Sequence, residues 1–130
     1  MQDEYIELAD KLGVGDRVVL AGYRTDVKDF YDMADIFVLP SYQEGLSVAL
    51  MEAMASGLPC VVSDIRGNAD LVNDEELRFS PNDKECLISI LKKQTADKQG
   101  MSTEGLKNRK TVEKYRTEIV VKNLKSIYCE

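Results

Sequence analysis

Two carboxylates separated by seven residues are the strongest chemical feature of the sequence. Glu44 stands directly before Gly45, and Glu52 interrupts an apolar run over residues 46–55. A carboxylate among apolar residues is costly unless it has a partner or faces a polar cleft. One carboxylate accepts hydrogen bonds from two hydroxyl groups at once, which suits the vicinal diol of a sugar. For Glu52, a role as an ion-pair partner or as a cap for a neighbouring loop is equally open on chemistry alone.

The stretch between the two acids is predicted to begin a helix. Leu46 or Ser47 is the expected first residue, and a helix that is apolar on all sides is normally buried. The unpaired N–H groups and the positive dipole end of a helix start bind anions, so a phosphate fits there. Two acids beside such a site indicate a ligand with both phosphate and hydroxyl groups.

Short apolar runs alternate with helical patterns along the chain. The runs predict strands at residues 17–21, 36–39, Cys60–Ser63 and 77–79. The alternation predicts an α/β fold, a Rossmann-like parallel sheet flanked by helices.

The predicted strands bring two loops to one edge of the sheet. Residues 36–39 lead through Pro40 into the Glu44 turn, and Cys60–Ser63 leads through Asp64 into residues 65–68. In open parallel sheets, ligands bind beyond the carboxyl ends of the strands. We therefore expect both loops on the same rim.

Helical spacing predicts the other elements. They are a helix over residues 3–12, a helix over 27–34 with Thr25 as N-cap, a short helix over 68–72, and a helix capped by Asn82 or Asp83 that continues to Leu91. Residues 95–103 are polar and are predicted to form a loop, and residues 104–128 are predicted to form one or two amphipathic helices that pack on the domain.

Composition excludes several classes of function. A net charge of −6 argues against a nucleic-acid binder, and the absence of histidine excludes serine–histidine or cysteine–histidine catalysis and histidine metal sites within these 130 residues. No segment has the length of an apolar membrane span or the pattern of a signal peptide. Cys60, Cys86 and Cys129 are widely spaced, which is typical of a reduced, cytoplasmic protein.

The acid pair and its surroundings resemble a known family. The matching positions are Glu44 to Ser47, residues 50–59 and residues 61–64, with further matches at residues 18–22, 34–41 and 81–83. Together they resemble the C-terminal, nucleotide-sugar-binding domain of retaining glycosyltransferases of family 4 (group 1), which have the GT-B fold. The resemblance covers most of the first ninety residues.

The resemblance implies a role for each matched position. The acid matching Glu44 contacts hydroxyl groups of the donor sugar near the reacting carbon, which makes it the candidate catalytic residue. The acid matching Glu52 holds the ribose hydroxyls of the nucleotide. Backbone amides matching Gly45, Leu46 and Ser47 contact the diphosphate or the sugar.

Two further loops have open roles. Tyr23 and Arg24 lie where the family holds the nucleobase, largely by backbone contacts, and a surface arginine is an equally good interpretation of Arg24. Arg66 and Gly67 stand where the family often has two adjacent glycines and a glutamate. Arg66 is therefore open between a phosphate contact and an exposed side chain.

The resemblance also implies an activity. It is that of the donor-binding portion of an enzyme that transfers a hexose from a nucleoside-diphosphate sugar to a glycan or lipid-linked acceptor in polysaccharide assembly, with no metal ion or other cofactor. Family members have a glycine-rich strand–helix unit upstream and an amino-terminal acceptor domain. We therefore expect residues 1–130 to be one donor-binding domain, a piece of a longer protein that is inactive alone. An incomplete sheet leads to the further hypothesis that this piece dimerises.

Other interpretations stay open. The tail carries a basic surplus, with 13 basic and 11 acidic residues from Arg66 onward against 4 and 12 before it. Its lysines, from Lys84 to Lys125, form either a solvated helix face, the commoner case, or a contact with the inner face of an anionic membrane that holds a lipid-linked acceptor. A non-catalytic nucleotide-sugar-binding or interaction domain and a sugar-nucleotide epimerase share the fold. A phosphoacceptor receiver domain fits less well, because the first predicted strand is followed by Gly22, Tyr23 and Arg24 instead of acids.

Overall fold

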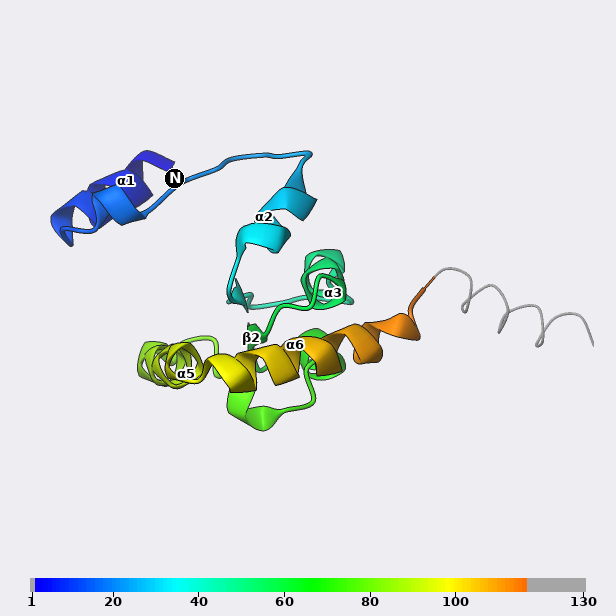
Figure 1. Ribbon diagram of the computed structural model, residues 1–130. Helices are drawn as coiled ribbons and strands as arrows, with labels where there is room; N and C mark the ends of the chain where they lie inside the picture. Colours follow the sequence, from blue (N-terminus) through cyan, green and yellow to red (C-terminus); the bar gives the residue numbers. More distant parts are fainter. Residues whose placement is uncertain (1, 117–130) are drawn as a thin grey trace, which may run out of the picture.

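The apolar run Cys60–Ser63 is the central strand, β2, of a parallel three-stranded sheet, and all four of its residues are buried. β1 (Phe37–Leu39) pairs with one edge of β2 and β3 (Arg78–Phe79) with the other. The computed structural model, shown in Figure 1, describes residues 2–116. This arrangement confirms the predicted fold class, an α/β Rossmann-like parallel sheet flanked by helices.

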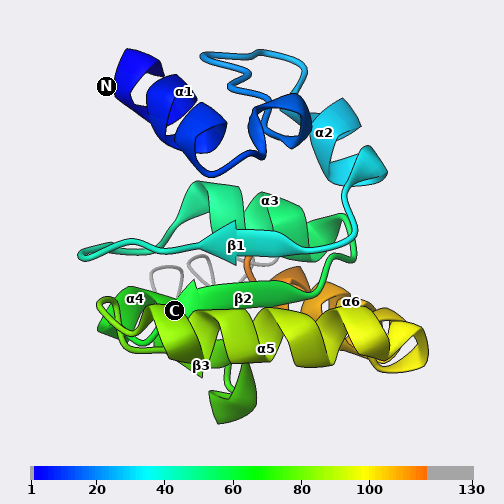
Figure 2. The same cartoon turned by 90° about the vertical axis from the view of Figure 1, so that its left-hand side faces the viewer.

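The register of the sheet aligns the carboxyl ends of the strands. Val62 lies opposite Leu39 in β1 and opposite Arg78 in β3. The loops that follow β1 and β2 therefore leave the sheet at the same edge, as predicted, and Figure 2 shows this edge where the arrows of both strands end.

Helices cover the sheet on both faces. α3 (Val48–Ala55) and α5 (Lys84–Ala96) lie on opposite sides of it, and α6 (Lys98–Glu113) packs against both helices (Figure 1). The remaining elements are α1 (Gln2–Lys11), α2 (Val27–Met33) and α4 (Arg66–Ala69), and the 3-10 helices η1 (Gly15–Arg17) and η2 (Glu75–Leu77).

The core lies between the sheet and helices α3, α5 and α6. Its largest fully buried apolar side chains come from α3, β2 and the segment after α4, and they are Leu50, Met54, Val61, Val62, Leu71 and Leu77. The prediction that the whole of α3 is buried is wrong, because Val48 is 63% exposed and Glu52 and Ala55 are also exposed. One face of α3 packs on the sheet, and the opposite face borders open cavities.

The C-terminal end of α3 is held by α6. Gly57 has a positive φ of 82°, which favours glycine after a helix. Asn108 Nδ2 donates to the carbonyl oxygen of Leu58 at 2.7 Å, and Arg109 Nη2 donates to that of Ser56 at 3.0 Å. The first bond holds the turn that follows α3, and the second satisfies the carbonyl group of the C-cap residue of α3.

The prediction of a strand at residues 17–21 is wrong. Residues 18–20 have no regular secondary structure, and Val19 is 85% exposed. Figures 1 and 2 show this segment away from the sheet, beyond α2. Its apolar side chains predict burial, but Val18, Val19 and Leu20 are all exposed, at 44%, 85% and 39%.

The predicted loop at residues 95–103 is also wrong. α5 continues to Ala96 and α6 begins at Lys98, so only Asp97 separates the two helices. Asp97 Oδ1 accepts from the backbone N–H of Gly100 at 2.9 Å, which caps α6. An aspartate cap starts a helix even where the following residues are polar.

Other boundaries shift by a few residues. Asp26, not Thr25, is the N-cap of α2, and its carboxylate binds Arg24 instead of the helix N–H groups. α4 covers Arg66–Ala69 instead of residues 68–72, and α3 begins after Leu46 and Ser47. Asp83 caps α5 as predicted, by accepting from the N–H of Cys86. Within the predicted helical region 104–128, residues up to Glu113 are helical, and residues 117–128 and Cys129 lie outside the described part.

No helix within residues 2–116 combines the length and apolar character needed to cross a bilayer. Cys60 lies in the core, and its burial raises the pKa of the thiol to about 12. Such a thiol stays protonated at neutral pH, so Cys60 behaves as an apolar core residue.

The contact between α6 and the turn after α3 predicts the effect of one substitution. A Cβ at Gly105 would stand 2.0 Å from the carbonyl oxygen of Gly57. Alanine favours a helix over glycine by about 1 kcal/mol, but overpacking against backbone costs roughly 1–3 kcal/mol. We therefore expect Gly105→Ala to lower the free energy of unfolding in urea. Ser102→Ala, at an exposed position of α6, is the control, and unchanged stability of Gly105→Ala would contradict this packing.

Candidate functional site

The turn after β1 places Glu44 at the rim of the sheet. Pro40 ends the strand, and the hydroxyl of Ser41 donates to Glu44 Oε1 at 2.9 Å. Glu44 is half-buried, and its Oε2 has no partner among the described residues. The carboxylate is therefore oriented through one oxygen and keeps the other for a further donor.

Unpaired amides follow Glu44. Ser47 is the N-cap of α3, and its Oγ accepts from the N–H of Leu50 at 3.3 Å. Within the described residues, the backbone N–H groups of residues 45–49 have no acceptor. Because α3 begins at Val48, the predicted amides of Gly45, Leu46 and Ser47 precede the first helical turn, and those of Val48 and Ala49 extend the set. These N–H groups are free to bind an anion.

The loop after β2 packs directly on this turn. A Cβ at Gly67 would stand 1.8 Å from the carbonyl oxygen of Gly45 and 2.7 Å from that of Glu44. Only a glycine allows α4 to approach so closely. Gly67 thus lies at the predicted site, and it contributes as a spacer between α4 and the Glu44 turn. The Arg66 side chain is exposed and forms none of the ion pairs among the described residues.

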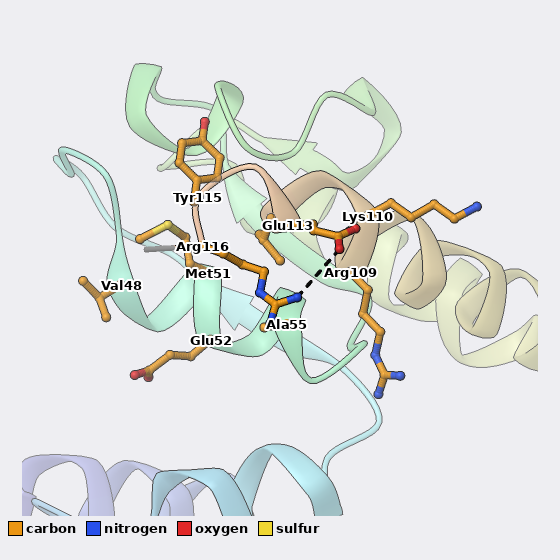
Figure 3. Close-up of a pocket in the computed structure, with 10 residues that line it drawn as sticks. Val48, Met51, Glu52, Ala55, Arg109, Lys110, Glu113, Tyr115 and Arg116 are labelled. Carbon is orange, nitrogen blue, oxygen red and sulfur yellow. Dashed lines mark ion pairs between the residues drawn. The ribbon is translucent and has the colours of Figure 1, made fainter. Parts of the chain in front are cut away.

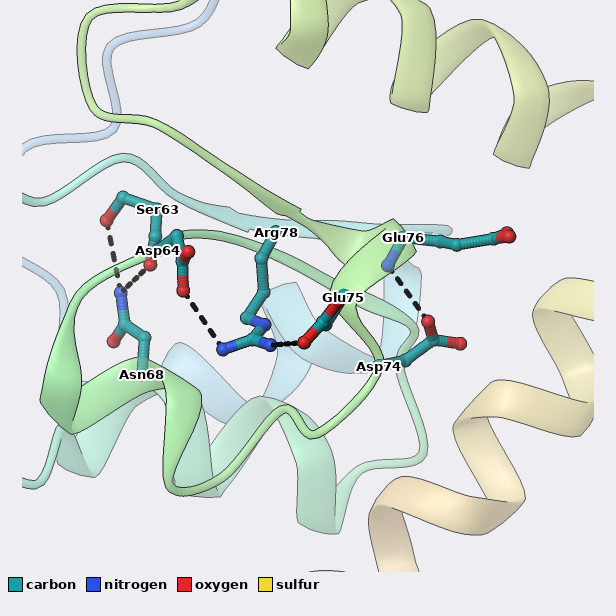
Figure 4. Close-up of polar contacts among 7 residues, drawn as sticks. All are labelled: Ser63, Asp64, Asn68, Asp74, Glu75, Glu76 and Arg78. Carbon is teal, nitrogen blue, oxygen red and sulfur yellow. Dashed lines mark hydrogen bonds and ion pairs between the residues drawn. The ribbon is translucent and has the colours of Figure 1, made fainter.

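Two buried polar side chains join the ends of β1 and β2 (Figure 4). Ser63 Oγ lies 2.5 Å from the carbonyl oxygen of Ser41, and Asn68 Nδ2 donates to Ser63 O and Ser63 Oγ, each at 3.1 Å. Asn68 is fully buried, and its Oδ1 has no partner among the described residues. A buried acceptor without a partner costs about 1–3 kcal/mol. Burying the Asn68 amide therefore costs stability, and its two hydrogen bonds to Ser63 offset this cost.

Arg78 ties the same loop to β3. Its side chain is 15% exposed, and its guanidinium contacts Asp64 Oδ1 at 2.9 Å and Glu75 Oε1 at 3.5 Å (Figure 4). The N–H of Asp64 also donates to the carbonyl oxygen of Phe79 at 2.7 Å. Asp64 is thus held by β3 and gives the rim loop a fixed starting point.

Glu52 lies on the exposed side of α3. The hydroxyl of Tyr31 donates to Glu52 Oε2 at 3.2 Å and lies 3.3 Å from the carbonyl oxygen of Ala49. Burial, and then the charge of Glu52, raise the pKa of Tyr31, so its hydroxyl stays protonated and remains a donor at neutral pH. Glu52 forms no ion pair among the described residues, and its Oε1 is without a partner there. Like Glu44, it is oriented by one neutral hydroxyl and keeps one oxygen available.

Glu52 borders two cavities. One, of about 410 Å³, lies between α2 and α3 and includes Tyr31 and Val27 in its wall. The other, of about 600 Å³, lies between α3 and α6. Glu113 and Arg116 also line this second cavity and form an ion pair, with Arg116 Nη1 3.8 Å from Glu113 Oε1. Figure 3 shows that the side chain of Glu52 points away from this ion pair. Both volumes are in the range of small-molecule sites, about 300–1,000 Å³.

Tyr23 and Arg24 form no hydrogen bond or ion pair with the rim residues in the described part of the chain. Tyr23 is 94% exposed. Arg24 binds Asp26 through two hydrogen bonds of 2.8 and 2.6 Å and lies over the ring of Phe30. These contacts stay within the segment that leads into α2. Their assignment to the nucleobase stays a prediction.

Sequence patterns alone did not single out four polar residues of this site. Ser41 and Ser63 each stand at or just beyond the end of a buried strand, which is a signal that the sequence does contain. Asn68 falls in a loop whose helix begins earlier than predicted, and Tyr31 has the spacing of an ordinary core residue. Their hydrogen bonds to the rim depend on tertiary contacts.

The fold and the rim define a class of protein, an α/β domain with an acid pair beside unpaired amides at the carboxyl ends of parallel strands. A family model described as glycosyl transferases group 1 matches residues 1–116. The chain belongs to this family of glycosyltransferases.

The chain is also similar in sequence to known proteins. The Escherichia coli UDP-Gal:alpha-D-GlcNAc-diphosphoundecaprenol alpha-1,3-galactosyltransferase is 43% identical over 84 residues, which are 63% of this chain and 22% of that enzyme. Protein CapJ of Staphylococcus aureus is 30% identical over 118 residues, which are 88% of this chain and 30% of that protein.

A solved structure supports the fold. Sucrose-phosphate synthase from Thermosynechococcus elongatus superposes with a TM-score of 0.83 at 27% identity, over 94% of this chain and 32% of that one. This likeness agrees with the GT-B assignment. The chain spans between about a fifth and a third of the length of these three proteins.

The contact of Gly67 with the Glu44 turn can be tested by one substitution. Because a Cβ at Gly67 would overlap the carbonyl oxygen of Gly45, Gly67→Ala must displace α4 or the turn. We expect large changes in the amide resonances of residues 44–47 in a ¹⁵N correlation spectrum, with the resonances of α5 unchanged. Asp70→Ala, at the exposed end of α4, is the matched control. Unmoved resonances at residues 44–47 in Gly67→Ala would refute the contact.

Proposed function

We propose that the chain is the donor-binding portion of a retaining glycosyltransferase of family 4. The enzyme would transfer a hexose from a nucleoside-diphosphate sugar to a glycan or lipid-linked acceptor. One observation carries this proposal. Glu44 and Glu52 each bind one neutral hydroxyl through one oxygen and keep the other oxygen free, and unpaired backbone N–H groups lie between them in the chain. This arrangement suits a ligand with hydroxyl groups at two places and a diphosphate between them.

Each group has a distinct role in the proposal. Glu44 accepts from hydroxyls of the hexose and orients its reacting carbon. Glu52 accepts from the ribose hydroxyls, with the nucleoside directed to the cavity between α2 and α3 that Tyr31 borders. The amides of residues 45–49 bind the diphosphate and stabilise the negative charge that develops as it leaves. Because N–H groups and the helix dipole supply this stabilisation, the proposal includes no metal ion.

The comparisons support a nucleotide-sugar donor. The E. coli relative is named for UDP-Gal and for a diphosphoundecaprenol acceptor. We propose a donor of the same class here, and an acceptor that is met in the cytoplasm or at the inner face of the membrane. Since the relatives are several times longer, we propose that a further domain binds the acceptor, and that residues 1–130 alone bind donor, as a monomer or a dimer, without transferring sugar.

The two acids predict different binding defects. We expect Glu52→Gln to weaken UDP and UDP-galactose alike by about tenfold, the size of one charge-assisted hydrogen bond. Glu44→Gln should leave UDP binding unchanged and remove most of the additional affinity for UDP-galactose. Titration of the ¹⁵N-labelled chain with each nucleotide measures both effects, because NMR detects weak binding.

Glu85→Gln, an exposed acid in the first turn of α5, is the control for a lost charge. In an active enzyme that carries this chain, Glu44→Gln should lower mainly turnover and Glu52→Gln mainly donor affinity. Equal and small effects of the two substitutions, or no response of residues 45–49 to any nucleoside-diphosphate sugar tried, would overturn the proposed roles.

A further inference from the structure

We propose that Ser41, Ser63 and Asn68 form a positioning network that sets the orientation of Glu44, and through it the recognition of the sugar part of the donor. The inference rests on the proposed function, since it assumes that Glu44 binds the sugar. None of the three residues was assigned a role from the sequence. The hydrogen bonds of the network run from α4 to the carboxylate of Glu44.

The direction of the first bond is fixed by chemistry. The backbone oxygen of Ser63 only accepts hydrogen bonds, so the group of Asn68 that lies 3.1 Å from it must be Nδ2 and not Oδ1. The same Nδ2 donates to Ser63 Oγ at 3.1 Å. Because Ser63 Oγ accepts there, its own hydrogen is free to be donated elsewhere.

The second bond joins two strands. Ser63 Oγ lies 2.5 Å from the carbonyl oxygen of Ser41, and 3.3 Å from that of Leu39. The shorter contact is the stronger, so the hydroxyl of Ser63 anchors the backbone of Ser41 where the chain leaves β1. The position of Ser41 thereby depends on Asn68.

The third bond reaches the acid. With its carbonyl group anchored, Ser41 donates through its own hydroxyl to Glu44 Oε1 at 2.9 Å. The carbonyl oxygens of Glu44 and Gly45 rest against Gly67, next to Asn68 in α4. α4 thus fixes the turn by contact and the carboxylate by the hydrogen-bond network.

Burial separates positioning from ligand contact. Ser63 and Asn68 are both fully buried, so neither reaches a ligand at the rim. Figure 4 shows Asn68 directed from α4 toward Ser63, inside the loop. They act through Glu44, and their loss should therefore affect the sugar and not the nucleotide.

The test compares the affinities for UDP and UDP-galactose in the whole chain. We expect Ser41→Ala and Asn68→Ala each to reduce the extra affinity for UDP-galactose by roughly three- to tenfold, with UDP binding unchanged. Ser41→Thr, which keeps the hydroxyl, should restore it. Asn108→Ala is the matched control, because Asn108 is also a buried asparagine that donates to a backbone carbonyl, far from Glu44 in the chain.

The outcomes separate this inference from the proposed function. If the unaltered chain binds UDP and UDP-galactose equally, or if Glu44→Gln leaves the difference intact, the role of Glu44 itself is wrong. If Glu44→Gln removes the difference but Ser41→Ala and Asn68→Ala do not, only the positioning network is wrong. If Asn108→Ala removes the difference between UDP and UDP-galactose as fully as Asn68→Ala does, the effect is one of general stability, and the network is again refuted. If Asn68→Ala does not fold, the same affinities are compared for Ser41→Ala and Ser41→Thr, because Ser41 is partly exposed. Equal extra affinity for UDP-galactose in these two variants would refute the network.

Discussion

The close approach of Gly67 to the carbonyl oxygens of Glu44 and Gly45 is the constraint on which the rim depends. Two loops from neighbouring parallel strands meet there without a side chain between them. The N–H groups of the turn have no acceptors among the described residues. A larger residue at position 67 would separate the loops, and Ser63 could then no longer bridge β1 and β2. Backbone geometry at one glycine thus supports the turn with its unpaired amides, the acid Glu44 and the hydrogen bonds behind it.

The chemistry of the two acids separates the proposed function from its rivals. The structural acids of this domain are paired with a cation or with helix N–H groups, as Asp64 is with Arg78 and Asp97 is with the N–H of Gly100. Glu44 and Glu52 are instead held by neutral hydroxyls, which orient a carboxylate without cancelling its charge. A receiver domain would need clustered acids after its first strand, whereas β1 is followed by Pro40, Ser41, Tyr42 and Gln43. A non-catalytic binder or an epimerase of this fold would use the same rim, so the family membership favours the transferase.

The sequence predicts those parts of the fold that local patterns determine. β2 was predicted with its observed bounds because Cys60–Ser63 is buried on both faces. Asp83 caps α5 as predicted because its side chain accepts from a nearby N–H group. The strand predicted at residues 17–21 is absent. An apolar run predicts burial, but a strand also needs a second strand to pair with, which the local sequence does not specify. The prediction of a loop at residues 95–103 was wrong because one residue, Asp97, ends α5 and caps α6. Glu44 and Glu52 could be singled out from type and spacing, but their partners Ser41 and Tyr31 could not, since those contacts need the tertiary fold.

The anchoring of α3 by α6 has a consequence for how the molecule is made. Asn108 and Arg109 bind carbonyl groups that lie 50 and 53 residues earlier in the chain. A growing polypeptide emerges from the ribosome amino end first, so α3 and the sheet are complete before their last support exists. Until α6 is synthesised, the carbonyls at the end of α3 remain in water, and its apolar side is open to chaperones. The end of α3 therefore obtains these two hydrogen bonds only after about 50 further residues have been synthesised.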